Sequence, residues 1–253
     1  KPGLAPGFAA GFAANLIGSG FLGGLVGGFL AGYIMKWIKA NIKGGKTLAG
    51  FFNFFLYPVI GTFVVGTLML FVVGKPVALL NTGLTNWLNA MQGTNAILLG
   101  ALIGAMVSFD LGGPVNKAAY AFCLGAMGNG NLIPYATFAS VKMVSAFTTT
   151  LVTKLKPKYF LEEERELGNS TWILGLAGIT EGAIPVALND PFRVLGSFVA
   201  GSMVTGAIVA YFKLGLGVPG AGILSMLFMN WNGAESSLMG GIVWFAAALV
   251  GTV

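Results

Sequence analysis

The sequence predicts an all-α, polytopic membrane protein with about six to eight spanning helices and additional re-entrant hairpins. Three observations support this fold class. Of the 253 residues, 56% are hydrophobic and only 9% are charged, and 40 are glycine. The mean hydropathy is +0.83, and several apolar runs approach the length of about 18 uncharged residues that a spanning helix needs. Soluble domains carry about 25% charged residues, so a soluble domain of this composition is not expected.

The first part of the chain alternates apolar runs with basic or polar segments. Residues 7–35 are apolar and rich in glycine, a composition typical of helices that approach each other closely in lipid. Residues 36–50 carry several lysines and indicate an amphipathic segment at the cytoplasmic surface. Residues 51–73 form an uncharged span that we expect to end at Lys75-Pro76. Residues 77–93 are too polar to face lipid.

A break in hydrophobic sequence follows the next apolar run, residues 94–109. The segment Asp110–Lys117 contains two glycines and a proline, which interrupt a helix. A helix should resume over residues 118–130 and end at the Gly128–Asn131 sequence. Residues 132–153 then predict another span.

The second half begins with a charged block at residues 154–166, which is typical of a solvated loop or a short surface helix. Residues 172–188 are too short and too interrupted for an ordinary span. They predict a re-entrant hairpin whose tip lies around Glu181–Pro185, because non-helical backbone at membrane depth must be buried in protein or line a wet cavity. Residues 192–212 predict a span, and residues 215–230 and 237–253 predict one or two more.

Acidic side chains within apolar sequence are the first candidates for a functional site. Glu181 lies at the expected hairpin tip, where its carboxylate could accept hydrogen bonds from free backbone N–H groups and from ligand hydroxyls. The alternative role is a structural cap. Asp110 and Asn116 bracket the Gly-Gly-Pro break, and an amide offers both a donor and an acceptor. Asp110 could instead cap a helix or pair with Lys117.

Asp190 and Arg193 are weaker candidates. Asp190 precedes a proline, as an N-cap residue often does, and Arg193 lies in the same first turn. Arg193 could pair with a carboxylate, meet a phosphate or mark the cytoplasmic edge. With no histidine and a single cysteine, Cys123, we expect no metal or other cofactor. The net charge of +6 comes largely from lysines beside apolar runs, so we expect no nucleic-acid partner.

Several of these segments resemble the fructose-family permease component, enzyme IIC, of the bacterial sugar phosphotransferase system. The segments that carry the resemblance are Leu80–Leu88, Phe109–Phe122, Glu162–Gly168, Ile179–Pro185 and Asp190–Val194. The resemblance implies a homodimeric inner-membrane protein that carries a sugar inward while a phosphocysteine on a partner IIB domain phosphorylates it. It also implies that residues 1–253 form one membrane-embedded IIC domain that lacks its first spans and is cut in its last span.

Within that family the acid that matches Glu181 is a sugar-site residue, and the Gly-Gly-Pro-Val-Asn segment similarly supports Asp110 and Asn116. Glu181 would orient the acceptor hydroxyl or take its proton. This chain reads Val218-Pro-Gly-Ala-Gly222 where many members carry Pro-His-Gly-Gly, so its substrate could be a relative of fructose. From the residues alone, an ion-coupled secondary transporter and a non-transporting receptor or assembly protein remain alternatives.

Overall fold

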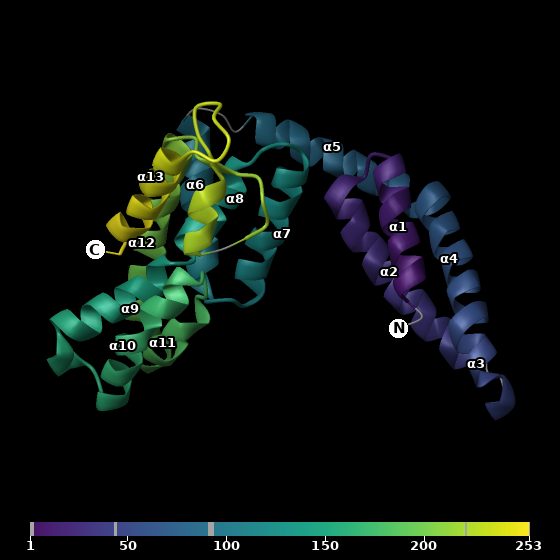
Figure 1. Cartoon of the computed structure of the whole chain (residues 1–253), viewed down its shortest axis with the longest axis horizontal. Helices are drawn as coiled ribbons and strands as arrows, with labels where there is room; N and C mark the ends of the chain where they lie inside the picture. Colours follow the sequence, from purple (N-terminus) through teal and green to yellow (C-terminus); the bar gives the residue numbers. More distant parts are fainter. Residues whose placement is uncertain (1–2, 43–44, 91–93, 221, 253) are drawn as a thin grey trace. The chain divides into compact units, whose positions relative to one another are not determined.

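The computed structural model describes residues 3–42, 45–90, 94–220 and 222–252. Most of them lie in helices, and one pair of two-residue strands occurs among them (Figure 1). The all-α prediction is therefore confirmed. The chain forms two compact units, Lys1–Trp87 and Leu88–Val253.

The first unit is a bundle of apolar helices. Its helices are α1 (Leu4–Leu16), α2 (Gly20–Asn41), α3 (Ala49–Phe51), α4 (Tyr57–Leu68) and α5 (Gly74–Ala90), whose last residues, from Leu88 on, belong to the second unit. Helix α1 packs against both α2 and α4. Small side chains make this possible, because a Cβ added at Gly27 would lie 2.8 Å from the Cβ of Ala10. The glycine-rich composition of this segment thus serves close helix packing, as the sequence predicts.

Helices α3 to α5 form one continuous helical stretch that includes two π-helical turns, Phe52–Leu56 and Met69–Val73. The prediction that this helix ends at Lys75-Pro76 is wrong. A proline in a helix lacks an N–H and crowds the carbonyl one turn earlier. The carbonyl one turn before Pro76 belongs to Val72, which lies within the wider π turn Met69–Val73, and the helix continues through the proline to Ala90.

The second unit contains the remaining helices. These are α6 (Thr94–Phe109), α7 (Pro114–Gly128), α8 (Ile133–Val141), α9 (Val144–Leu155), α10 (Glu162–Leu176), α11 (Ile184–Asn189), α12 (Pro191–Tyr211) and α13 (Leu238–Val250). Helix α12 packs along α6 and also contacts α8 and α13. Gly206 and Gly100 let the backbones of α12 and α6 meet, since a Cβ on either would strike the other's carbonyl oxygen. The Ser108 and Ser202 hydroxyls share a buried hydrogen bond of 2.6 Å across the same pair.

Two segments differ from expectation, and a third takes one of two expected forms. Residues 132–153 form two helices that are interrupted at Lys142-Met143. The acidic part of the charged block, expected as a loop or a short surface helix, is helical, because α10 begins at Glu162 and continues to Leu176. Residues 215–230 are not a span. Strand β1 (Gly215–Leu216) pairs antiparallel with β2 (Met229–Asn230), with Gly215 opposite Asn230, and a 3₁₀ turn at Ile223–Phe228 lies between them.

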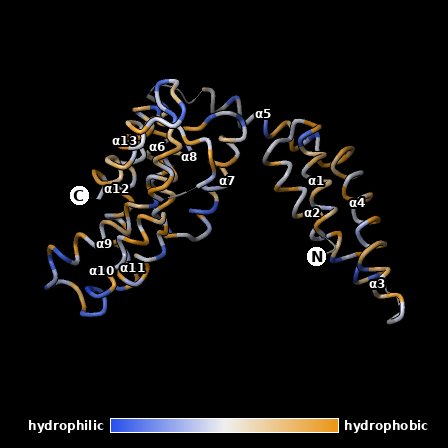
Figure 2. The backbone as a smooth tube through the Cα atoms, in the orientation of Figure 1, coloured by the Kyte–Doolittle hydropathy of each residue, from blue (hydrophilic) through white to orange (hydrophobic). Residues whose placement is uncertain are grey.

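Two helical stretches in the described parts of the chain are long and apolar enough to cross a membrane, Ala49–Gly83 and Pro191–Tyr211. Shorter apolar helices occupy Leu4–Leu16, Asn95–Phe109 and Leu238–Val250. The number of spans therefore stays a prediction. Large apolar side chains such as Phe54 and Phe71 are exposed on the first stretch, and Figure 2 shows the apolar character of α4 and the hydrophilic connection between α9 and α10. Such exposed apolar surface suits contact with lipid.

Candidate functional site

The first structural element of the site is the break between α6 and α7. The Asp110 carboxylate accepts hydrogen bonds from the backbone N–H groups of Val115 at 2.6 Å and Asn116 at 3.0 Å. These groups lie in the first turn of α7, where they have no partner within the helix. Gly112 adopts a φ of +106° within the break, a conformation that favours glycine. Asp110 therefore caps α7, one of the two roles that the sequence suggests for it.

Asn116 and Lys117 are fixed by backbone carbonyls. The buried Asn116 amide donates from Nδ2 to the Val107 carbonyl at 2.7 Å, which ties α7 to the end of α6. The Lys117 ammonium donates to the Gly112 carbonyl at 2.6 Å. In this structure Lys117 thus stabilises the break by its hydrogen bond to the Gly112 carbonyl and not by an ion pair with Asp110.

The second element is the turn between α10 and α11. Gly178 has a φ of +73°, and Glu181–Ala183 form a 3₁₀ turn before α11 begins. The Thr180 hydroxyl donates to Oε2 of Glu181 at 3.3 Å. At the other end, Asn189 Nδ2 donates to Oε1 of the buried Glu164 at 2.7 Å. This bond brings the end of α11 back to the start of α10, so the segment forms a hairpin. That the hairpin re-enters the membrane stays a prediction.

The two breaks meet at Glu181. A Cβ added at Gly112 would lie 2.6 Å from Oε1 of Glu181. Beside this contact lies a cavity of about 370 Å³, within the range of about 300–1,000 Å³ that is typical of small-molecule sites. Its lining residues are Gly112, Asn116, Lys117, Tyr120, Tyr135, Phe138, Lys142, Thr180, Glu181, Pro219 and Gly220. Glu181 is exposed, so its carboxylate is accessible to a ligand.

Aromatic and charged groups share the cavity wall. The rings of Tyr120 and Tyr135 lie 5.2 Å and 6.1 Å from that of Phe138, measured between centroids. Lys142 lies at the α8–α9 interruption, with its Nζ 5.6 Å from the centroid of the Phe138 ring. Lys142 and Glu181 carry opposite charges and line the same cavity. A wall that combines rings with hydroxyl, amide and carboxylate groups can both stack against a sugar and hydrogen-bond its hydroxyls.

The structure brings together some of the predicted site residues and not others. Glu181 and Asn116 line the cavity, whereas Asp110 lies behind it as a cap. Asp190 and Arg193 are not among the lining residues. Asp190 is the N-cap of α12, and Arg193 lies 3.6 Å from it on an exposed surface. Sequence reasoning missed Lys142, although a lone lysine within an apolar run is a signal for a functional residue.

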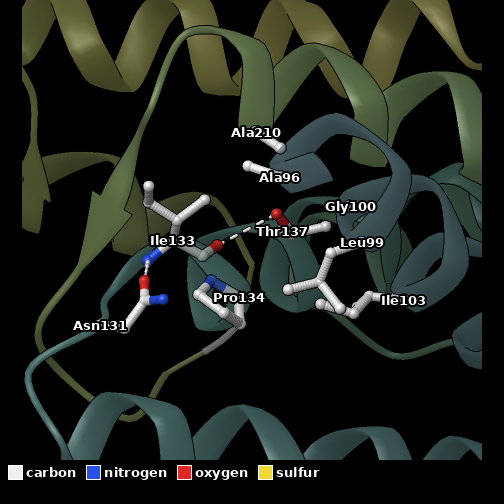
Figure 3. Close-up of a pocket in the computed structure, with 9 residues that line it drawn as sticks. All are labelled: Ala96, Leu99, Gly100, Ile103, Asn131, Ile133, Pro134, Thr137 and Ala210. Carbon is white, nitrogen blue, oxygen red and sulfur yellow. Dashed lines mark hydrogen bonds between the residues drawn. The ribbon is translucent and has the colours of Figure 1, made fainter. Parts of the chain in front are cut away.

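A second cavity in the same unit is much smaller, about 20 Å³ (Figure 3). Its wall is mostly apolar, and the Thr137 hydroxyl there donates to the Ile133 carbonyl of the same helix. This volume suits about one water molecule. It is too small for a sugar, so of these two cavities the one beside Glu181 is the candidate site.

Comparison with known proteins gives consistent results. The family model described as "Phosphotransferase system, EIIC" matches residues 2–214. The chain is 64% identical over 216 residues to the 2-O-α-mannosyl-D-glycerate-specific EIIABC component of the Escherichia coli K12 PTS, covering 85% of this chain and 33% of that protein. It is 40% identical over 218 residues to the fructose-specific EIIB'BC component of the same organism, covering 86% and 38%.

A third relative is the fructose permease IIC component of Bacillus amyloliquefaciens, which is 38% identical over 185 residues, covering 73% of this chain and 60% of that protein. The chain spans about a third of the length of the first two relatives. No solved structure matches the chain. The matched residues 2–214 contain both helix breaks, Glu181 and Lys142. The chain therefore belongs to the EIIC family of the phosphotransferase system, whose members are integral inner-membrane permeases.

Proposed function

We propose that this chain takes a sugar across the inner membrane and holds it for phosphorylation by a IIB domain. The observation that carries the proposal is the cavity in which Glu181, Asn116 and an aromatic wall face one small-molecule volume. The names of two relatives, EIIABC and EIIB'BC, support a IIB partner. The homodimer implied by the family resemblance is part of the proposal.

The proposed substrate is a glycosyl glycerate, with fructose as the competing candidate. The relative at 64% identity is named for 2-O-α-mannosyl-D-glycerate, whereas the fructose-specific relative from the same organism is at 40%. The cavity supports this choice. Pro219 and Gly220 line it, and they belong to the segment that lacks the histidine of the Pro-His-Gly-Gly sequence common among fructose-type members. The wall of this cavity therefore differs where a fructose site would carry an imidazole.

The proposed reaction is transfer of a phosphoryl group from a IIB cysteine to a sugar hydroxyl. The S–P bond of the phosphocysteine breaks, an O–P bond forms at the sugar, and the hydroxyl proton passes to the Glu181 carboxylate. Asn116 uses its amide nitrogen on Val107, which leaves its amide oxygen to accept from a second hydroxyl. For translocation, we propose that the α10–α11 hairpin and its neighbouring helices move as a unit around the site, as alternating access requires.

The test is Glu181→Gln in the full-length transporter. Membranes that contain it are supplied with phosphorylated IIB, and the phosphorylated product of 2-O-α-mannosyl-D-glycerate and of fructose is measured. We expect a loss of about 100-fold or more, because the amide cannot accept the proton. Glu163→Gln, an exposed acid in the first turn of α10, is the matched control and should keep the wild-type rate. A Glu181→Gln protein that is present at normal amounts and phosphorylates at the wild-type rate would overturn this role.

A further inference from the structure

The cavity beside Glu181 has an uneven balance of charge. Two cationic side chains, Lys117 and Lys142, share it with one carboxylate, Glu181. Lys117 is exposed and already donates to the Gly112 carbonyl. Lys142 is half-buried and lies in the interruption between α8 and α9. The two lysines are therefore not equivalent, and Lys142 is the one whose partner is unexplained.

The groups around Lys142 stabilise its positive charge but do not form an ion pair with it. The ring of Phe138 lies 5.6 Å from Nζ, a distance at which the ring face attracts a cation. Glu181, which carries the opposite charge, lines the same cavity. Yet over residues 3–42, 45–90, 94–220 and 222–252 the structure records one ion pair within 4.0 Å, and it joins Arg193 to Asp190. Lys142 thus lines the cavity, and among the described residues no carboxylate lies within 4.0 Å of its ammonium.

We infer that Lys142 is a specificity-determining residue that binds an anionic group of the substrate, while Glu181 binds its hydroxyls. This inference rests on the proposed function and names the part of a glycosyl glycerate that the site would recognise. A half-buried cation is costly when no carboxylate contacts it directly. A substrate with one carboxylate would supply that contact, whereas a neutral hexose would not. An ammonium also suits a carboxylate as a compact point charge.

Two oxyanions could reach this lysine, the carboxylate of the sugar and the phosphoryl group delivered by IIB. Binding in the absence of any phosphoryl donor separates them. Full-length protein is purified in detergent, and the dissociation constants of 2-O-α-mannosyl-D-glycerate and of its neutral carboxamide are measured. The two probes share the mannose and differ only in charge at the glyceryl end. Their ratio therefore reports on recognition of the carboxylate.

We expect wild-type protein to prefer the carboxylate over the carboxamide by about 10- to 100-fold, the range of a charge-assisted hydrogen bond in a partly dry site. Lys142→Met keeps the length of the side chain and removes its charge, so the preference should fall to within about threefold. Lys142→Arg should keep most of the preference. Lys154→Met removes an exposed lysine from the last turn of α9 and should leave the ratio unchanged.

A wild-type ratio near one, or a Lys142→Met protein that keeps the full preference, overturns the inference. Lys142→Met that keeps the preference but slows phosphorylation assigns the lysine to the phosphoryl group instead, which also overturns it. If Lys142→Met is not recovered folded, Lys142→Gln takes its place and the wild-type ratio still decides. If IIB phosphorylates neutral fructose and the wild-type ratio of dissociation constants is near one, only the proposed role of Lys142 is refuted. Failure of IIB to phosphorylate any sugar would refute the proposed function.

Discussion

Replacing Gly112 by alanine would test whether the meeting of the two helix breaks sets the sugar site. The added methyl group would lie 2.6 Å from Oε1 of Glu181, and ordinary contacts of a Cβ begin near 3.4 Å. The carboxylate must therefore retreat by about 0.8 Å. It can do so at little cost to the fold, since it is the far end of a flexible side chain.

The substitution has two separable effects. At a φ of +106° an alanine is strained, and the stability loss should be about 1–2 kcal/mol. A displacement near 1 Å of a positioned catalytic group can reduce activity by about 100-fold. We therefore expect a modest loss of stability together with a large loss of sugar phosphorylation.

Gly130→Ala is the matched control. Gly130 also has a positive φ, +85°, but an added Cβ there meets nothing within 4 Å. Both variants should lower the unfolding free energy by similar amounts, and only Gly112→Ala should lower phosphorylation by IIB and binding of 2-O-α-mannosyl-D-glycerate. Equal activities of the two variants at equal stability would refute the placement of Glu181 against this break.

Two further predictions concern the scaffold of the site. Asp110→Ala removes the cap that accepts hydrogen bonds from the backbone N–H groups of Val115 and Asn116. We expect the unfolding free energy measured in detergent to fall by about 0.5–2 kcal/mol, and Asp110→Asn should restore part of this loss. Gly206→Ala forces a methyl group onto the Gly100 carbonyl and should lower the unfolding free energy by about 1–3 kcal/mol in the same measurement. Gly196→Ala lies in the same helix with open space around it and should be neutral or slightly stabilising.

The sequence predicts the helix breaks well, because their causes are local. Glycine, proline and an acid at Asp110–Lys117 interrupt a helix whatever surrounds them, and α6 and α7 do end and begin there. Asp190 before Pro191 similarly predicts the start of α12. Pro76 is the exception, since the preceding π turn depends on packing that composition does not reveal.

The assembly of the cavity could not be predicted in the same way, because it depends on contacts between distant segments. Lys142 is one charge in an apolar run, and nothing local places it on the same wall as Glu181. Glu164 illustrates the converse. It belongs to a charged block that suggests a solvated surface, yet it is buried and bonded to Asn189 across the hairpin. Neither of these two arrangements can be predicted from the periodicity or the composition of the sequence.

The geometry of the first break separates the roles of Asp110 and Glu181. Both carboxylate oxygens of Asp110 accept backbone N–H groups of α7, and Asp110 is not among the residues that line the cavity. By fixing the start of α7, these bonds fix the turn that presents Gly112 to Glu181. A change at Asp110 should therefore reach the sugar only by moving Gly112. Asp110 then supports the proposed site, and Glu181 is the acid that we expect to meet the ligand.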